Sequence, residues 1–138
     1  MIDWTDMEII RCLQKNSRMQ WKEIGQRVHL TGQAVAARIR RLEELGIIEE
    51  YTVKLNTEKM GRAITAFITV YMKTAGHHSF ESFAAGNEEI ISVHRTSGEG
   101  CYLLEASLAS SEDLSRLLDR ILAYGNYRVN LSIGRIKG

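Results

Sequence analysis

The sequence predicts an α+β protein with a helical N-terminal part and a mixed C-terminal part, and three observations lead to this interpretation. Apolar residues recur at helical spacing in three blocks between Asp3 and Leu45. From Ala63 onwards their spacing changes to two, which is typical of strands with one face against a core. Basic residues are concentrated in the helical part, although the net charge of the 138-residue chain is only +1. We therefore expect two domains with different tasks.

The first predicted helix covers residues 3–15, and either Asp3 or Thr5 can cap its start. The segment Asn16–Arg18 ends it. Helical spacing indicates that apolar side chains of this helix form a buried stripe. The stripe is expected to contain Met7, Ile10 and Leu13, with Ile9 beside it and Cys12 as a small core residue.

Residues 21–45 predict two short helices separated by a tight turn. Gly25 leaves room for a second helix to approach closely, Thr31 is a candidate N-cap for the second helix, and Gly46 is a candidate C-cap. Apolar residues at spacings of three and four form the inward faces of both helices. These residues are Ile24, Val28, Val35, Ile39 and Leu42.

Residues 47–55 predict two short strands that turn near Glu49–Glu50. Three helices followed by such a hairpin form a winged helix-turn-helix, so we expect residues 1–55 to be one domain. Residues 56–62 have the composition of a linker, and residues 63–138 are expected to be the second domain.

The second domain is predicted to follow the order β-α-β-β-α-β, a ferredoxin-like sandwich. Strands are expected at 63–73, 91–95, 101–108 and 127–136. Ile91 and Val93 are expected to alternate with polar residues in the second strand, and His94 is expected to be an ordinary sheet residue. One helix is expected near Phe80–Ala84, and the other follows Ser110, which with Asp113 forms a weak capping box.

The helical domain has the charge and the pattern expected of a DNA-binding module. Between residues 11 and 41, Glu23 is the only acid. The basic residues there are Arg11, Lys15, Arg18, Lys22, Arg27, Arg38, Arg40 and Arg41. In a helix-turn-helix the second helix enters the major groove, where Gln33 would match adenine and Arg38 guanine or phosphate. The candidate DNA contacts are Lys22, Arg27, Thr31, Gln33, Ala37, Arg38 and Arg41. The alternative is an ordinary solvated helix surface.

Other classes of protein are disfavoured. No apolar run reaches the ~18 residues of a membrane span, and no signal peptide is evident, so we expect a cytoplasmic, nucleoid-associated protein. Cys12 and Cys101 form no paired motif, and a disulfide is not expected. The adjacent His77 and His78 point apart without further ligands, which indicates a surface loop rather than a metal site. No catalytic triad or phosphate loop is present, so we expect no enzyme and no cofactor.

A series of residues at fixed spacing runs through the helical domain and into the linker. It consists of Asp3, Asp6, Ile9, Ile10, Leu13, 16–18, 23–25, Leu30, Thr31, Val35, Arg38, Ile39, Leu42, Glu43, 46–48, Tyr51 and Gly61. With this series the chain resembles the Lrp/AsnC (leucine-responsive regulatory protein and asparagine regulator) family of transcription factors over nearly its whole length. The resemblance implies binding to double-stranded DNA by a homodimer, which often assembles into tetramers or octamers. It also implies dimer contacts through the C-terminal sheets and a response to an amino acid or related metabolite.

The resemblance places effector and oligomer contacts at residues 98–102, which are Gly98, Glu99, Gly100, Cys101 and Tyr102. Family members that bind amino acids commonly have an aspartate at the position of Cys101, and a thiol accepts hydrogen bonds poorly by comparison. The final strand also lacks the threonine-rich character often found there. Gly98 and Gly100 allow close approach of a ligand or a subunit, or they form a plain hairpin turn.

Three hypotheses follow. The first is a transcriptional regulator that binds specific DNA sites and whose C-terminal domain assembles the oligomer and reads a metabolite. The alternative is an architectural protein that wraps DNA with little sequence preference and has no effector, which Cys101 favours. The third is a metabolite-binding module whose winged helix makes only protein contacts. Gln33 and Arg38 favour the first hypothesis, because their side chains match base edges in pairs.

Overall fold

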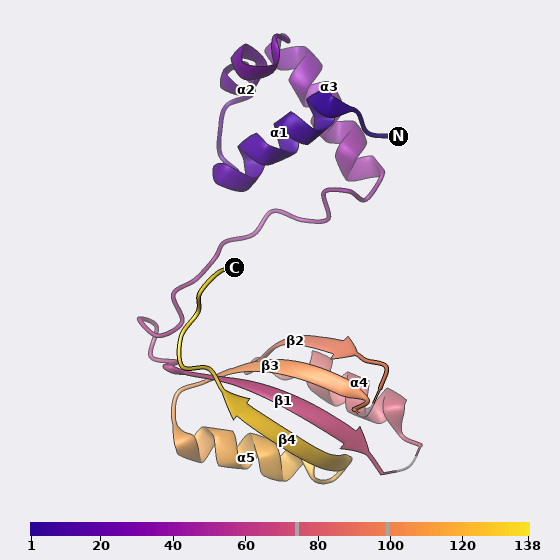
Figure 1. Ribbon diagram of the computed structural model, residues 1–138, viewed down its shortest axis with the longest axis vertical. Helices are drawn as coiled ribbons and strands as arrows, with labels where there is room; N and C mark the ends of the chain where they lie inside the picture. The colour runs from indigo at the N-terminus through magenta and orange to yellow at the C-terminus, as the bar shows by residue number, and fades with distance from the viewer. Residues whose placement is uncertain (74, 99) are drawn as a thin grey trace. The chain divides into compact units, whose positions relative to one another are not determined.

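The computed structural model describes residues 1–73, 75–98 and 100–138 (Figure 1). The chain divides into two compact units, which we call the N-terminal unit (Met1–Lys54) and the C-terminal unit (Leu55–Gly138). Among the described residues, no helix has the length and apolar character needed to cross a membrane.

The N-terminal unit contains the three predicted helices, α1 (Trp4–Lys15), α2 (Trp21–Val28) and α3 (Gly32–Glu44). Helix α1 begins at Asp3 with a capping box, in which the Asp6 amide donates to Asp3 and the Asp3 amide donates to Asp6, at 2.8 and 3.1 Å. Thr31 accepts from the Ala34 amide at 3.1 Å and so caps α3, as predicted. Gly46 follows the end of α3 with a φ of +73°.

The core of this unit confirms the inward faces predicted for α2 and α3 but corrects that of α1. Its buried residues are Ile9, Cys12, Ile24, Val28, Val35 and Ile39. On α1, Met7, Ile10 and Leu13 are only half-buried, whereas Ile9, Cys12 and Asp6 face inward. The inward face predicted for α1 was wrong because the prediction used apolar residues alone, whereas the buried stripe includes the carboxylate of Asp6.

Gly25 allows the close approach expected of it, but its neighbour is the turn after α2 rather than a second helix. A Cβ atom on Gly25 would lie 2.3 Å from the carbonyl oxygen of Leu30. The Leu30 amide donates back to the Gly25 carbonyl at 2.9 Å, so the turn folds tightly over this residue.

The wing expected over residues 47–55 is absent: every residue of this segment is described, and none belongs to a strand. The Ile47 and Ile48 amides donate to the Leu42 carbonyl and close the end of α3 around Gly46. The alternating Tyr51, Val53 and Leu55 side chains are all exposed. A hairpin of two short strands is marginal without an apolar face packed on a core, which explains why the pattern alone did not produce one.

The C-terminal unit has the predicted β-α-β-β-α-β order. Its elements are β1 (Ile64–Met72), α4 (His77–Ala85), β2 (Ile90–Arg95), β3 (Tyr102–Leu108), α5 (Ser111–Ile121) and β4 (Gly125–Leu131). All strand pairs are antiparallel and the sheet order is β2-β3-β1-β4, the ferredoxin-like arrangement. The fourth strand starts and ends earlier than the 127–136 expected from the sequence.

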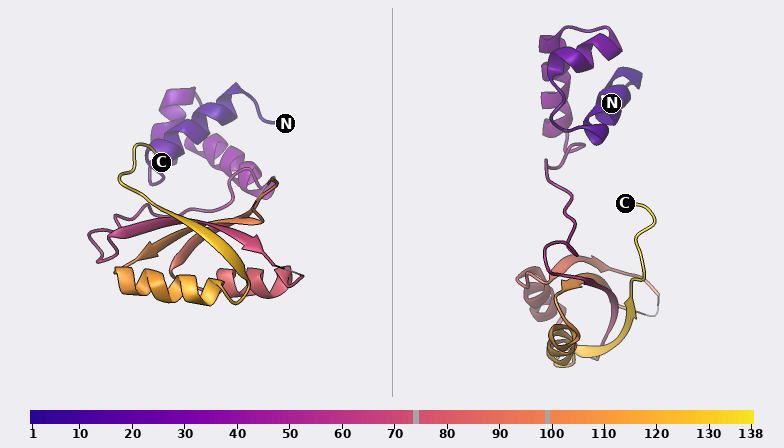
Figure 2. Two further views of the ribbon diagram at one scale, coloured as in Figure 1. Left: turned by 60° about the horizontal axis from the view of Figure 1, so that its bottom comes forward. Right: turned by 90° about the vertical axis from the view of Figure 1, so that its left-hand side faces the viewer.

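Helices α4 and α5 lie on the same side of the sheet, as the left view of Figure 2 shows. The core lies between these two helices and the sheet, and it contains the alternating apolar residues of β1 and β3 as predicted. Its buried residues are Ala66, Ile68, Val70, Phe80, Ala84, Ile90, Tyr102, Leu104, Ala106, Leu108, Leu117, Leu118 and Ile121. We call the other side of the sheet the open face; on it Phe67 and Leu103 are 38% and 40% exposed.

Two local expectations for this unit are wrong. Ile90 rather than Ile91 is buried in β2, because the register shifts at a bulge between Ile90 and Ser92. His77 and His78 form the first turn of α4 rather than a surface loop. His94 is an exposed sheet residue of β2, as expected.

Candidate nucleic-acid interface

Helix α3 presents one side to solvent and buries the other. Gln33, Ala37 and Arg40 are exposed, and their spacings of four and three place them along one stripe. On the opposite side Val35, Ala36, Ile39 and Leu42 are buried. No ion pair or side-chain hydrogen bond of Gln33 or Arg40 occurs among the described residues. We call Gln33, Ala37 and Arg40 the α3 stripe.

The start of α2 lies against the start of α3. A Cβ atom on Gly32 would lie 3.4 Å from the Lys22 amide nitrogen, so the two helices meet closely at this corner. Lys22 and Thr31, both predicted contacts, are exposed beside it. Arg27 is exposed on α2, with its guanidinium 3.8 Å from the Glu23 carboxylate. Such an exposed pair contributes little to stability, so Arg27 can exchange this partner for another anion.

Arg38 is placed differently from what the sequence suggested. Its Nη1 donates to both carboxylate oxygens of Asp3, at 2.9 and 2.8 Å, and to Asp6 at 3.0 Å. Asp6 is 1% exposed, and Arg41 Nη1 lies 3.5 Å from its other oxygen. Arg41 Nη2 also donates to the Met1 carbonyl at 2.7 Å. We call Asp3, Asp6, Arg38 and Arg41 the α1–α3 ion cluster.

Asp3 and Arg38 stabilise each other's charged forms. The hydrogen bond from Arg38 holds the pKa of Asp3 below its ordinary value, and the two carboxylates raise the pKa of Arg38. The Arg38 guanidinium therefore faces α1, which argues against the predicted contact with a base edge. The sequence carries a signal for this arrangement, since Asp3 and Asp6 have the same three-residue spacing as Arg38 and Arg41.

Arg40 is the side chain that sequence reasoning left out of the candidate contacts. It lies seven residues after Gln33, which is two helical turns, and so belongs to the same stripe. Choosing among Arg38, Arg40 and Arg41 requires knowing which side of α3 packs against α1. The spacing of residues within α3 does not give this information, because the partner of Arg38 is Asp3, which lies 35 residues earlier in the sequence.

Gly100 and Cys101 of the predicted effector segment contact β1 of their own chain. A Cβ atom on Gly100 would lie 2.4 Å from Thr69 Cγ2, so the close approach at this glycine is to β1. The Cys101 amide donates to the Val70 carbonyl at 2.9 Å. Gly98 has a φ of +93° and open space around it. Glu99 lies outside the described residues. The Thr96 amide donates to the Cys101 carbonyl at 3.0 Å and the Thr96 hydroxyl donates to the Gly100 carbonyl at 3.1 Å, which supports the hairpin interpretation.

Tyr102, the last residue of that segment, connects β3 to α4. Its hydroxyl donates to Glu81 at 2.5 Å and lies 2.8 Å from His77 Nδ1. The side chain is 1% exposed, and Arg95 lies over the ring with Cζ 5.9 Å from its centroid. Burial, followed by the Glu81 hydrogen bond, raises the pKa of Tyr102 to about 12.

Tyr102 is expected to make stability fall at high pH. Its pKa is raised from 10.0 to about 12, so above pH 10 the unfolded chain loses this proton while the folded chain keeps it. The free energy of unfolding should decrease between these two values, and this decrease should be smaller in Tyr102→Phe. Chemical unfolding at pH 9, 10 and 11, followed by circular dichroism, measures it. Identical pH profiles for the two proteins would contradict the assignment.

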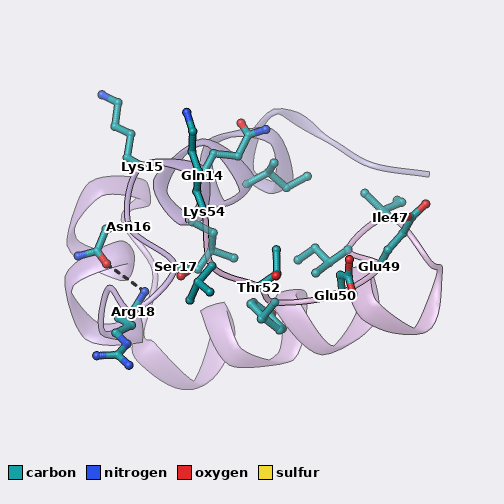
Figure 3. Close-up of a pocket in the computed structure, with 15 residues that line it drawn as sticks. Gln14, Lys15, Asn16, Ser17, Arg18, Ile47, Glu49, Glu50, Thr52 and Lys54 are labelled. Atoms are coloured by element: carbon teal, nitrogen blue, oxygen red, sulfur yellow. Dashed lines mark hydrogen bonds between the residues drawn. The ribbon is translucent and has the colours of Figure 1, made fainter. Parts of the chain in front are cut away.

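A groove of about 770 Å³ lies within the N-terminal unit, between the end of α1 and the segment that was expected to form the wing. Figure 3 shows Gln14 to Arg18 along one part of it and Ile47 to Lys54 along another. Its lining combines lysine and arginine with Glu49 and Glu50. With both signs of charge present, the groove does not define a ligand class. No grouping of three or more His, Cys, Asp or Glu suited to a metal occurs in the described part of the chain.

A helix-turn-helix with an exposed stripe on its second helix, in a chain with a ferredoxin-like domain, defines a class of DNA-binding proteins with a separate domain for assembly or ligands. The model of the AsnC-type helix-turn-helix domain matches residues 2–43, and that of the Lrp/AsnC ligand binding domain matches residues 65–138. The chain belongs to the Lrp/AsnC family of transcriptional regulators.

Relatives agree with this assignment along the whole chain. The HTH-type transcriptional regulator LrpB of Bacillus subtilis (strain 168) is 45% identical over 99% of this chain and 91% of its own length. LrpA of the same organism is 37% identical over 98% and 100%.

Solved structures agree as well. The structure of B. subtilis LrpC has a TM-score of 0.94 at 27% identity, covering 99% of this chain and 98% of that one. A transcriptional regulator from Neisseria meningitidis in complex with L-Met has a TM-score of 0.93 at 28% identity, covering 100% and 94%.

Proposed function

We propose that this regulator binds double-stranded DNA as a homodimer, with α3 of each subunit in the major groove. The observation that carries the proposal is the α3 stripe, which is exposed and has no side-chain partner among the described residues. Two such helices, one per subunit, would enter grooves about one helical turn apart, ~34 Å, on a roughly palindromic site. With binding of this kind, we expect the protein at the nucleoid, in the cytoplasm.

Each contact has a proposed role. Gln33 can pair with adenine, and Arg40 can donate two hydrogen bonds to guanine, because their donors and acceptors match those base edges. Lys22, Thr31 and Arg27 surround the corner of α2 and α3 and suit phosphate contacts, which fix the register. Ala37 leaves room on the stripe for a thymine methyl group. Arg38 and Arg41 hold α3 against α1 through the ion cluster.

The open face of the sheet supports a homodimer. Phe67 and Leu103 lie on it at 38% and 40% exposure, on the two central strands. Phe67 is paired with Glu105 on one side and with Asn130 on the other, so it lies near the middle of the face. A second copy of the same face would cover these side chains. Further assembly into tetramers or octamers rests on the family resemblance.

An amino acid or related metabolite is the proposed effector, bound by the C-terminal unit. The family match over residues 65–138 is to a ligand binding domain, and the N. meningitidis relative is in complex with L-Met. The second candidate is an architectural protein without an effector. It is favoured by Cys101 at the position of the family's usual aspartate and by the contact of Gly100 with Thr69.

The experiment that tests the proposal compares binding to the gene's own upstream DNA with binding to unrelated DNA of equal length. It is run with and without each of the twenty amino acids. We expect a preference of about 10³ or more at physiological salt and a shift with at least one amino acid. Equal affinity for both DNAs, unchanged by any amino acid, would support the architectural candidate instead.

Arg40→Ala is expected to weaken binding to the upstream site by about 1–3 kcal/mol, because a base-reading arginine loses both of its hydrogen bonds. Binding to unrelated DNA should change less. The control is Arg116→Ala, which removes the same charge from α5, where the side chain pairs with Asp113. If Arg40→Ala loses affinity equally for both DNAs, Arg40 contacts the backbone and reads no base.

A further inference from the structure

Trp21 continues the buried stripe of α2 but is not buried. It precedes Ile24, Gly25 and Val28 by three, four and seven residues, which places it on their side of the helix. Those three residues are buried, whereas Trp21 is 52% exposed. An indole on the inward side of a helix with half its surface uncovered is unusual for a large apolar residue.

Trp21 lies at the corner where α2 and α3 begin. A Cβ atom on Gly32 would lie 3.7 Å from the Trp21 carbonyl carbon, so α3 starts opposite the start of α2. The exposed Lys22, Thr31 and Gln33 share this corner. Gln20, the N-cap of α2, makes no side-chain hydrogen bond to the helix, so the amides of the first turn lack a side-chain cap.

We propose that Trp21 contacts the DNA backbone beside the groove that α3 enters. The apolar body of the indole would pack against a deoxyribose, and its Nε1–H would donate to a phosphate oxygen. Lys22 would neutralise a phosphate of the same DNA strand. Charge selects this occupant: the neighbours of Trp21 at the corner are a cation and neutral polar groups, and the nearby Glu23 pairs with Arg27. The proposal rests on the DNA binding proposed above.

Trp4 provides the contrast. It is 67% exposed and is the first residue of α1, directly after the N-cap Asp3. It lies beside Asp3 of the ion cluster and not at the corner where α2 and α3 begin, so exposure alone does not make it a candidate contact. Trp4 and Trp21 are the only tryptophans in the sequence, so each can be observed separately.

The test uses two full-length single-tryptophan proteins, Trp4→Phe and Trp21→Phe, titrated with the upstream DNA. In Trp4→Phe, which retains Trp21, saturation with DNA should change the emission and reduce quenching by acrylamide. In Trp21→Phe, which retains Trp4, both should stay the same. Trp21→Ala should lower affinity by about tenfold on upstream and unrelated DNA alike, since a backbone contact carries no sequence information. Trp4→Ala should bind within about twofold of the wild type.

The outcomes separate this inference from the proposed function. If Trp4→Phe binds DNA tightly while the emission and acrylamide quenching of Trp21 stay unchanged, Trp21 is no contact and the inference is wrong. If the wild-type protein binds neither DNA, the proposed function fails, and this inference fails with it. The fluorescence of Trp4→Phe keeps the native Trp21, so it gives an answer even if Trp21→Ala does not fold.

Discussion

Replacing Arg38 with alanine is expected to destabilise the N-terminal unit by about 2–3 kcal/mol, somewhat less than breaking a fully buried ion pair, because the Arg38 side chain is 32% exposed. Asp6 is 1% exposed and would lose its closest cation. Arg41, 3.5 Å away, would remain and limits the loss. Urea unfolding followed by tryptophan fluorescence measures this directly, because Trp4 and Trp21 both belong to that unit. The affinity of the folded protein for DNA should change little.

Arg40→Ala is the matched control. It removes the same kind of side chain two residues further along α3, and Arg40 has no ion pair among the described residues. It should leave the unfolding free energy within about 0.5 kcal/mol of the wild type. The ion cluster also makes stability depend on pH, because the pKa of Asp3 in the folded protein is lowered from 3.8. The stability that the Asp3 carboxylate contributes is therefore present above pH 3.8 and is lost as the pH falls through the pKa of the folded protein. Wild-type stability combined with weak DNA binding in Arg38→Ala would return Arg38 to the base-reading role.

Replacing Phe67 with aspartate is expected to dissociate the proposed dimer. Phe67 is on the open face, with neighbours on β3 and β4, so the new carboxylate would be buried without a partner between two subunits. We expect the dimer dissociation constant to rise by at least about 100-fold, corresponding to a few kcal/mol. Affinity for a palindromic site should fall as well, because two linked helices bind more tightly than one. Sedimentation equilibrium measures the first effect.

Leu122→Asp is the control for this change. Leu122 is also exposed, at 42%, but it caps α5 on the helical side of the sheet. It should leave the dimer intact and unfold near the wild-type temperature, because it replaces an exposed side chain away from the open face. A Phe67→Asp protein that still sediments as a dimer would show that the subunits associate through another surface.

The sequence predicts most of the fold because period and capping are local properties. The Thr31 cap, the strands with alternating Ala66, Ile68 and Val70, and the order of elements all follow from residues close together in the chain. The failures are those where a distant partner decides. Asp6 is buried because Arg38 reaches it from α3. The bulge in β2 that buries Ile90 depends on its pairing with β3.

For the candidate site, the sequence places the proposed DNA contacts on α3 but does not show which side of that helix faces solvent. Gln33 and Ala37 belong to the exposed stripe as proposed from the pattern, whereas Arg38 lies toward α1 and Arg40 takes its place. The wing failed for a related reason: its apolar residues alternate, but Tyr51, Val53 and Leu55 stay exposed and do not pack on the unit. Nothing in the sequence indicates that Trp21 is exposed, since its spacing from Ile24 and Val28 is that of a core residue.

The ion cluster also reduces the number of counterions that DNA binding can release. Of the basic residues between 11 and 41, Arg11, Arg27, Arg38 and Arg41 pair with carboxylates of the same unit. Glu8, Asp3 and Asp6, which bind three of them, precede that stretch in the sequence. Each phosphate neutralised contributes about −0.9 to the slope of log K against log salt concentration. Arg27 can exchange its weak, exposed pair for a phosphate, so if Lys15, Arg18, Lys22, Arg27 and Arg40 contribute, the slope per subunit is about −4.5 at most. The other three basic residues of this stretch, Arg11, Arg38 and Arg41, are occupied by carboxylates of their own unit.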